Sequence, residues 1–307
     1  MVGFSLGFLS LMIFISLTGI IGNVFLILSI IQARFSRMKS FEVFLLGLAA
    51  FNLEEIIIVD LYDIAMFQSI ISFDTWLCRM LKFLTVLGET ASTLFTVLIS
   101  IFRYQKLKDA ERRVSLPIFL DNIRSAWMVS GICAILAILL SAPTYAIKFH
   151  GHLENFTDHS VGCPPDFFQC YSNNCPFLNH YYKHLFIVIC ILLPLFIISV
   201  TSCFMIKVLL FHKRIITPVL GVSKSGQSSK KYMGLKLQRS TVAILAAMGV
   251  FAVDGAFYLI LHLGLSPYNF PQWYQLELCM ISSYTTISPY VYGMGNNLNF
   301  FKKILKK

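Results

Sequence analysis

Charged side chains are scarce in this sequence. Of its 307 residues only 13% are Asp, Glu, Lys or Arg, whereas 57% are hydrophobic, and the mean hydropathy is +0.73. Soluble domains carry about a quarter charged residues, so this chain has too little polar surface to cover a globule in water. The composition therefore predicts a protein that is surrounded by membrane lipids.

Motifs that mark enzymes and cofactor-binding proteins are absent from the sequence as well. The polar stretches between its apolar runs hold no metal triad, nucleophile elbow or phosphate-binding loop, so we expect no enzymatic activity, no cofactor and no bound metal. A retinal protein needs a lysine in its last span, and residues 275–294 contain none. Repeated halves typical of transporters are missing too, which disfavours a channel or transporter.

Seven apolar runs are long enough to cross a bilayer, which takes about 20 mostly apolar residues. The expected spans are 4–31, 43–66, 79–102, 126–147, 184–210, 242–263 and 275–294. The second span is the weakest, because it holds the acids Glu54, Glu55, Asp60 and Asp63. The pattern predicts an all-α membrane protein with one seven-transmembrane helix bundle over residues 1–307.

Basic residues gather in alternate connections. The links between spans one and two, three and four, and five and six are rich in Lys and Arg, as is the C-terminal tail. Lys and Arg are retained in the cytoplasm, so we expect a multi-pass plasma-membrane protein with an extracellular N-terminus and a cytoplasmic C-terminus. These loops also account for the formal charge of +10, and no aromatic-interleaved basic patch points to a nucleic-acid partner.

Four cysteines and one glycosylation sequon fall on the predicted outer face. Cys78 begins the third span, and Cys163, Cys170 and Cys175 lie between the fourth and fifth spans. The outer face is oxidising, so disulfides can form there, and four cysteines allow three pairings. Asn155-Phe156-Thr157 is a sequon in the same connection, which predicts glycosylation of Asn155.

Acidic residues inside the spans are candidates for function, because ionisable groups are costly in hydrocarbon. Glu89 follows Cys78 by 11 residues and would lie about 16 Å deep in a straight helix. Asp254 is central in the sixth span. The two acids either line an outward cavity that binds a cation, or donate hydrogen bonds when protonated, or belong to an interhelical network. Glu54 and Glu55 point about 100° apart, so one can face the bundle while the other meets a neighbouring helix.

Polar uncharged residues in the spans have a structural interpretation. Asn23 lies in the first span, Asn52 in the second and Ser288 in the seventh. We expect them to form hydrogen bonds between helices rather than to contact a ligand.

Several motifs resemble those of rhodopsin-like (class A) G protein-coupled receptors. Arg103 follows Cys78 by 25 residues, as in this family. In chain order the matching motifs are Gly22-Asn23, residues 48–52, Cys78, Phe102-Arg103-Tyr104, Trp127, Pro194, Ser-Pro-Tyr-Val-Tyr at 288–292, and a segment at 297–307 similar to the family's short amphipathic helix 8. The sequence departs from the family in lacking the acid before Arg103, the second-helix Asp and the sixth-helix Cys-Trp-x-Pro.

The resemblance implies roles for particular residues. Arg103, Tyr104, Pro289 and Tyr292 would form the switch that couples to a heterotrimeric G protein. A ligand would lie among the third, fifth, sixth and seventh spans, with Glu89 and Asp254 as its polar contacts. Thr85 stands where amine receptors carry an Asp, so it is a further candidate for ligand binding. Cys78 would pair with Cys170 or Cys175.

Within this family the sequence is most similar to vomeronasal type-1 receptors and to their fish branch, the olfactory receptors related to class A. The similarity rests on the Ser-Pro motif at 288–289, the missing sixth-helix proline, the runs 102–107 and 119–122, and the sequon. It implies a chemosensory receptor for small odorant or pheromone molecules. A class A peptide or lipid receptor is the alternative.

Overall fold

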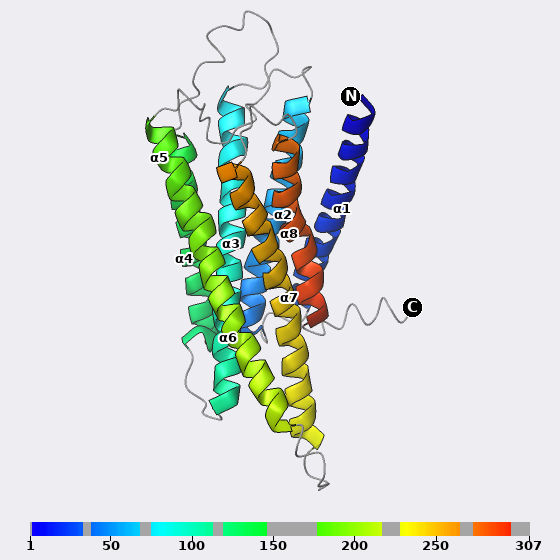
Figure 1. Ribbon diagram of the computed structural model, residues 1–307, viewed down its shortest axis with the longest axis vertical. Coiled ribbons are helices and arrows are strands. Elements are labelled where there is room, and N and C mark those ends of the chain that lie inside the picture. Colours follow the sequence, from blue (N-terminus) through cyan, green and yellow to red (C-terminus); the bar gives the residue numbers. More distant parts are fainter. Residues whose placement is uncertain are drawn as a thin grey trace, which may run out of the picture.

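The computed structural model describes residues 2–32, 38–67, 75–112, 119–145, 177–216, 228–264 and 273–295, and all regular secondary structure in these ranges is helical (Figure 1). The α-helices are α1 (Val2–Gln32), α2 (Ser40–Phe67), α3 (Thr75–Arg112), α4 (Ile123–Ser141), α5 (Phe177–Phe186), α6 (Leu193–Ile216), α7 (Ser228–Gly264) and α8 (Trp273–Gly295). Two 3-10 turns, η2 (Phe119–Asp121) and η3 (Ala142–Tyr145), flank α4, and a π-helical stretch, η4 (Ile187–Leu192), joins α5 to α6.

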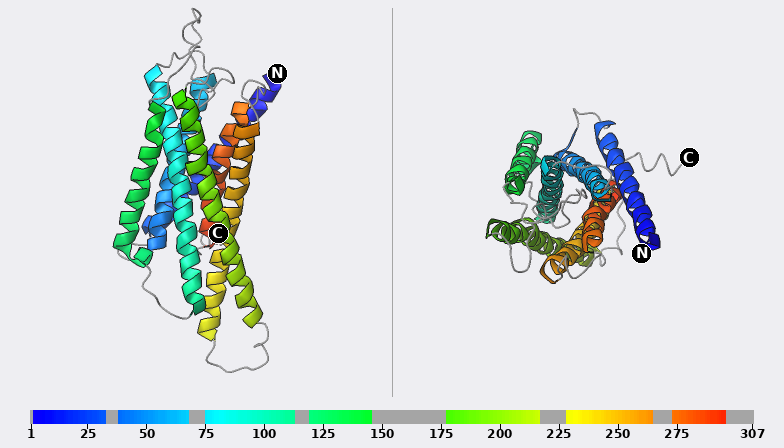
Figure 2. Two further views of the ribbon diagram at one scale, coloured as in Figure 1. Left: turned by 60° about the vertical axis from the view of Figure 1, so that its left-hand side comes forward. Right: turned by 90° about the horizontal axis from the view of Figure 1, so that it is seen from above.

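The helices form seven columns (Figure 1). Helix α5, η4 and α6 follow one another without a break and make a single column, whereas every other α-helix is a column by itself. Seen from above, the columns surround a common centre in chain order (Figure 2), and α3 packs against α2, α4, α6 and α7. The expected all-α fold with seven helices is therefore confirmed. The end at which α1 begins is called the upper end below, as it is drawn in Figure 1.

Five of the seven columns are long and apolar enough to cross a membrane by themselves, when the described residues are searched. They are α1, α3, α4 with η3, the α5–α6 column, and α7. Helix α2 falls short because of its carboxylates, and α8 is rich in Ser and Thr. These two helices contact each other and also α1, so their polar side chains can face protein rather than lipid.

Several helices extend beyond the apolar runs that predicted them. Helix α3 ends at Arg112 rather than at position 102, α7 begins at Ser228 rather than at 242, and α5 begins at Phe177 rather than at 184. Hydropathy marks only the part of a helix that fits the hydrocarbon layer, whereas backbone hydrogen bonding can continue into polar sequence. The amphipathic segment expected at 297–307 lies outside the described residues.

Two prolines explain where the helical geometry changes. The α-helical part of α4 ends at Ser141, two residues before Pro143, and continues only as η3. In the next column η4 ends two residues before Pro194, and the Leu193 amide donates to the Val188 carbonyl five residues back. Proline has no amide hydrogen and crowds the carbonyl four residues earlier, so it favours such wider or broken turns.

A polar layer crosses the bundle between two apolar clusters. On α2, buried Leu48 belongs to the lower cluster and buried Val59 to the upper one, and Asn52 and Glu55 lie between them. The same order is seen on α3, where Glu89 and Ser92 separate upper Val86 from lower Phe95. The core of this bundle is therefore divided at the level where its polar groups meet.

Asn52 is the centre of this layer. Its side-chain amide donates to Ser288 Oγ of α8 over 3.0 Å and to Asn23 Oδ1 of α1 over 3.4 Å, and its carbonyl accepts from Ser92 Oγ of α3 at 2.7 Å. Asn23 also donates to the Thr285 carbonyl of α8 at 3.0 Å. The three residues expected to bridge helices, Asn23, Asn52 and Ser288, thus connect four helices in one network.

Glycines allow the helices around this layer to approach closely. A Cβ atom on Gly22 of α1 would lie 2.7 Å from the Tyr290 ring of α8. A Cβ atom on Gly88 of α3 would lie 2.8 Å from Glu55 Cβ and 3.1 Å from Glu55 Cα of α2. Small residues let helix backbones come together in membranes, and Gly88 in this way brings Glu55 beside α3.

The network predicts a stabilising role for Asn52. Replacement of Asn52 by Leu removes the partners of Ser92 and Ser288 and should lower the free energy of unfolding by about 1–3 kcal/mol, since buried polar groups lose their hydrogen bonds. Thermal unfolding of the detergent-purified protein measures this as a lower Tm. The control is Ile57→Ala on the same helix, whose side chain is exposed. A Tm of the Asn52→Leu protein equal to that of the Ile57→Ala control would contradict the prediction.

Candidate functional site

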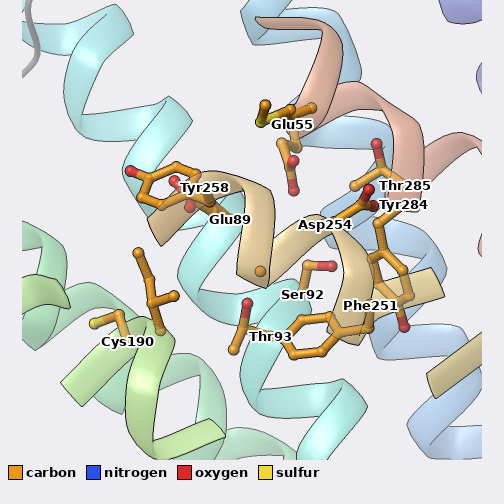
Figure 3. Close-up of a pocket in the computed structure, with 13 residues that line it drawn as sticks. Glu55, Glu89, Ser92, Thr93, Cys190, Phe251, Asp254, Tyr258, Tyr284 and Thr285 are labelled. Carbon is orange, nitrogen blue, oxygen red and sulfur yellow. The ribbon is translucent and has the colours of Figure 1, made fainter. Parts of the chain in front are cut away.

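A cavity opens in the upper half of the bundle, directly above the Asn52 network. Its walls come from α2, α3, η4, α7 and α8 (Figure 3), and about 570 Å³ of empty space lies between them, counting the part that opens to solvent. The apolar walls include Ile191, Phe251 and Met280, and the polar residues Thr93 and Tyr284 also line the cavity. A mostly apolar cavity with a few polar groups is typical of small-molecule sites.

Three carboxylates line this cavity, each from a different helix. Glu55 comes from α2, Glu89 from α3 and Asp254 from α7 (Figure 3). Glu55 and Glu89 interact electrostatically with each other. Of the two adjacent acids on α2, Glu55 therefore faces the cavity, whereas Glu54 Oε2 lies beside Gly88 of α3.

The carboxylates differ in their surroundings. The side chain of Glu55 is only 2% exposed, and its Oε2 atom has no hydrogen-bond partner among the described residues. Asp254 is half-buried and accepts a hydrogen bond of 2.7 Å from Ser283 Oγ of α8. Ser283 also donates to the Met280 carbonyl, which fixes the hydroxyl on the cavity side of α8. Asp254 is therefore hydrogen-bonded to α8, whereas the buried Glu55 Oε2 has no such partner among the described residues.

Thr85, the third candidate for ligand binding, lies outside the described lining of the cavity. Its side chain is buried, and its hydroxyl donates to the Leu81 carbonyl of its own helix at 3.0 Å. The hydroxyl is thus bonded back to its own helix turn, and ligand binding by Thr85 stays a prediction.

Two tyrosines connect the cavity with the lower half of the bundle. The hydroxyl of Tyr284, which lines the cavity, lies 2.7 Å from Thr96 Oγ1 of α3 and 3.5 Å from the Tyr292 hydroxyl. Tyr292 in turn interacts electrostatically with Arg103. A series of polar contacts thus runs from the cavity along α8 and α3 to Arg103.

Arg103 lies near the lower end of α3 and stacks on an aromatic ring. Its guanidinium carbon is 3.5 Å from the centre of the Phe41 ring of α2, within the range of a cation–π interaction. The neighbouring Tyr104 packs its ring against Phe204 of α6 at a centroid distance of 5.6 Å. The Phe41 contact could not be predicted from the sequence, because a phenylalanine in an apolar run has the same pattern whether it faces lipid, core or a cation.

Only some of the remaining candidate residues lie within the described part of the chain. Pro289 lies inside α8, between Ser288 and Tyr290. Cys78 is disulfide-bonded, but Cys163, Cys170 and Cys175 lie outside the described residues, so its pairing stays a prediction. Asn155 also lies outside them. Cys133, Cys190, Cys203 and Cys279, which lie within the helical columns, are free thiols.

Comparison with known proteins agrees with this architecture. The family described as 7 transmembrane receptor (rhodopsin family) matches residues 22–292, which is most of the chain. A search of curated proteins gave no match. The matched region runs from Gly22 in α1 to Tyr292 in α8 and contains the cavity, the Asn52 network and Arg103. The chain therefore belongs to the rhodopsin family of seven-transmembrane receptors.

Proposed function

We propose that this receptor is chemosensory, similar to vomeronasal type-1 receptors, and that it detects small odorant or pheromone molecules in the cavity bounded by α2, α3, η4, α7 and α8. The observation that carries the proposal is the cavity itself, whose mostly apolar walls with a few polar groups suit a small molecule. Membership of the family implies that binding is passed to a heterotrimeric G protein. A peptide or lipid ligand is the alternative that the experiment below separates.

The receptor is oriented with its N-terminus outside the cell in this proposal. The support is the distribution of basic residues, which gather at the lower end of the bundle, where α3 ends and α7 begins. This distribution favours the lower end as the cytoplasmic one. The cavity in the upper half then opens toward the outside. We expect a disulfide between Cys78 and Cys170 or Cys175, and glycosylation of Asn155, on the same side.

The effect of ligand binding is transmitted to the lower end of the bundle through α7 and α8. A ligand in contact with Asp254 acts on the hydrogen bond that joins Asp254 to Ser283, and one in contact with Tyr284 acts on the contacts of that hydroxyl with Thr96 and Tyr292. A ligand shifts the receptor between two arrangements only by its difference in affinity for them. In the active arrangement the lower parts of α6 and α7 separate, and Arg103 with the basic residues around it receives the G protein's C-terminal helix.

The test is signalling by the intact chain in cells that also express a promiscuous G protein. Calcium or cAMP is recorded while the cells are exposed to small organic acids, amines, steroids and peptides. We expect a response to at least one class of small molecule. A response to peptides alone would overturn the chemosensory proposal, and silence toward every compound despite confirmed surface expression would contradict it as well.

Arg103 is predicted to be required for signalling. Arg103→Ala removes the cation expected to meet the G protein and should reduce the maximal response by at least roughly tenfold, since a charged hydrogen bond contributes about 1.5–3 kcal/mol. Surface expression, measured on intact cells, should remain. The matched control is Arg124→Ala, which removes an exposed arginine at the start of α4. Equal responses from the two variants would rule out this role for Arg103.

The contact between Arg103 and Phe41 is predicted to hold the receptor inactive. Phe41→Leu keeps an apolar side chain in the core but removes the ring, and with it about 0.5–2 kcal/mol of cation–π attraction. Basal signalling without ligand should therefore rise several-fold. Phe204→Leu provides a comparison in which a ring is removed from the lower end without touching Arg103. Unchanged basal signalling in Phe41→Leu would show that the contact does not restrain Arg103.

A further inference from the structure

The charged groups that line the cavity are all of one sign. Glu55, Glu89 and Asp254 line it, whereas no Lys, Arg or His belongs to its lining within the described ranges. Lys82, the nearest basic residue to Glu89 along α3, lies two turns higher and is itself buried. A described lining that holds three carboxylates and no basic residue disfavours an anionic ligand and favours a cation.

Glu55 gives a second and independent indication of a ligand. Its side chain is 98% buried, yet Oε2 has no hydrogen-bond partner among the described residues. Figure 3 shows its carboxylate directed into the space between Glu89 and Asp254. A buried carboxylate oxygen without a partner costs free energy, and a positively charged donor in the cavity would supply what it lacks.

A metal ion does not fit this arrangement. Within the described residues, no three His, Cys, Asp or Glu side chains lie close enough together to hold one ion. The carboxylates come from three different helices, and one ion would not reach all of them. An extended cation with more than one charged end suits them better.

The rest of the wall also suits an organic cation. Tyr258, Tyr284 and Phe251 present aromatic rings, of which Phe251 and Tyr284 meet edge to face at 5.3 Å. Ammonium groups are attracted to aromatic faces, and a short carbon chain is compatible with the apolar walls at Ile191 and Met280.

We propose that the cavity binds a small organic cation with at least two ammonium groups, one beside Glu55 and Glu89 on α2 and α3, the other beside Asp254 on α7. This inference rests on the proposed function, in which the same cavity holds the receptor's ligand. A compound of this kind would join α2 and α3 to α7, the helix whose lower part moves in the proposed activation.

Binding is tested on the intact, detergent-purified receptor by thermal stabilisation, since a ligand that binds the folded state raises its Tm. The probes are 1,4-diaminobutane, the monoamine 1-aminopentane of similar length, the dicarboxylate succinate, and calcium chloride. We expect stabilisation by diaminobutane, a weaker effect of aminopentane and none of succinate. Equal stabilisation by succinate, by calcium or by aminopentane would overturn the inference, and so would the absence of any shift with diaminobutane.

Isosteric variants locate the site. Glu55→Gln and Asp254→Asn should each weaken the apparent affinity for diaminobutane by at least roughly tenfold, because each removes one charged partner. Asp60→Asn is the matched control, since Asp60 lies on α2 outside the cavity lining and accepts a 2.6 Å hydrogen bond from Ser16. Unchanged affinity in both Glu55→Gln and Asp254→Asn would overturn the inference.

Signalling in cells separates this inference from the function on which it rests. If diaminobutane stabilises the purified receptor through Glu55 and Asp254 but gives no response in cells, the ligand class is supported and the chemosensory function fails. If other small molecules activate the receptor and diaminobutane neither binds nor activates, the function stands and the ligand class is overturned.

Discussion

Hydrocarbon offers no hydrogen-bond partner to a polar side chain, and this constraint organises the receptor's core. Asn23, Asn52, Ser92 and Ser288 meet in one network, because each would otherwise be buried without a partner. The network ties α1, α2, α3 and α8 together at a single level. It also divides the apolar core into two clusters, and the cavity lies at the boundary between them.

The network separates an upper half, which contains the cavity, from a lower half, which contains Arg103. Glu55 and Asp254 lie in the upper half, whereas Arg103 lies in the lower half beside Phe41, a member of the lower apolar cluster. Tyr284 takes part in both, because its ring lines the cavity and its hydroxyl contacts Thr96 and Tyr292. In the proposed function, a ligand in the cavity would therefore act on the lower half through these hydrogen-bonded side chains as well as through the apolar packing.

Much of the fold could be predicted from the sequence, because bilayer thickness sets the length of an apolar run. The seven columns follow from that rule, although hydropathy could not show where α3 ends or where α7 begins. The π-helical stretch before Pro194 could not be predicted, because proline disturbs a helix in several ways and neighbouring packing selects one.

Individual residues of the site could be predicted from the sequence, but their arrangement could not. Glu89 and Asp254 were candidates because acids are costly in hydrocarbon, and they line one cavity. The choice between Glu54 and Glu55 depended on the rotation of α2, which is set by its close approach to Gly88 and is not encoded in α2 alone. Thr85 was a candidate by position in a family pattern, and it lies outside the described lining with its hydroxyl bonded to the Leu81 carbonyl.

The most direct test of the account is to fill the cavity. Thr93 lines it from α3 and is buried, so Thr93→Trp would occupy space that a ligand needs, while Thr93→Val keeps the volume and the shape. Signalling to a small-molecule agonist should be lost in Thr93→Trp and kept in Thr93→Val at equal surface expression. Equal responses from both variants would contradict the claim that this cavity is where the receptor detects its ligand.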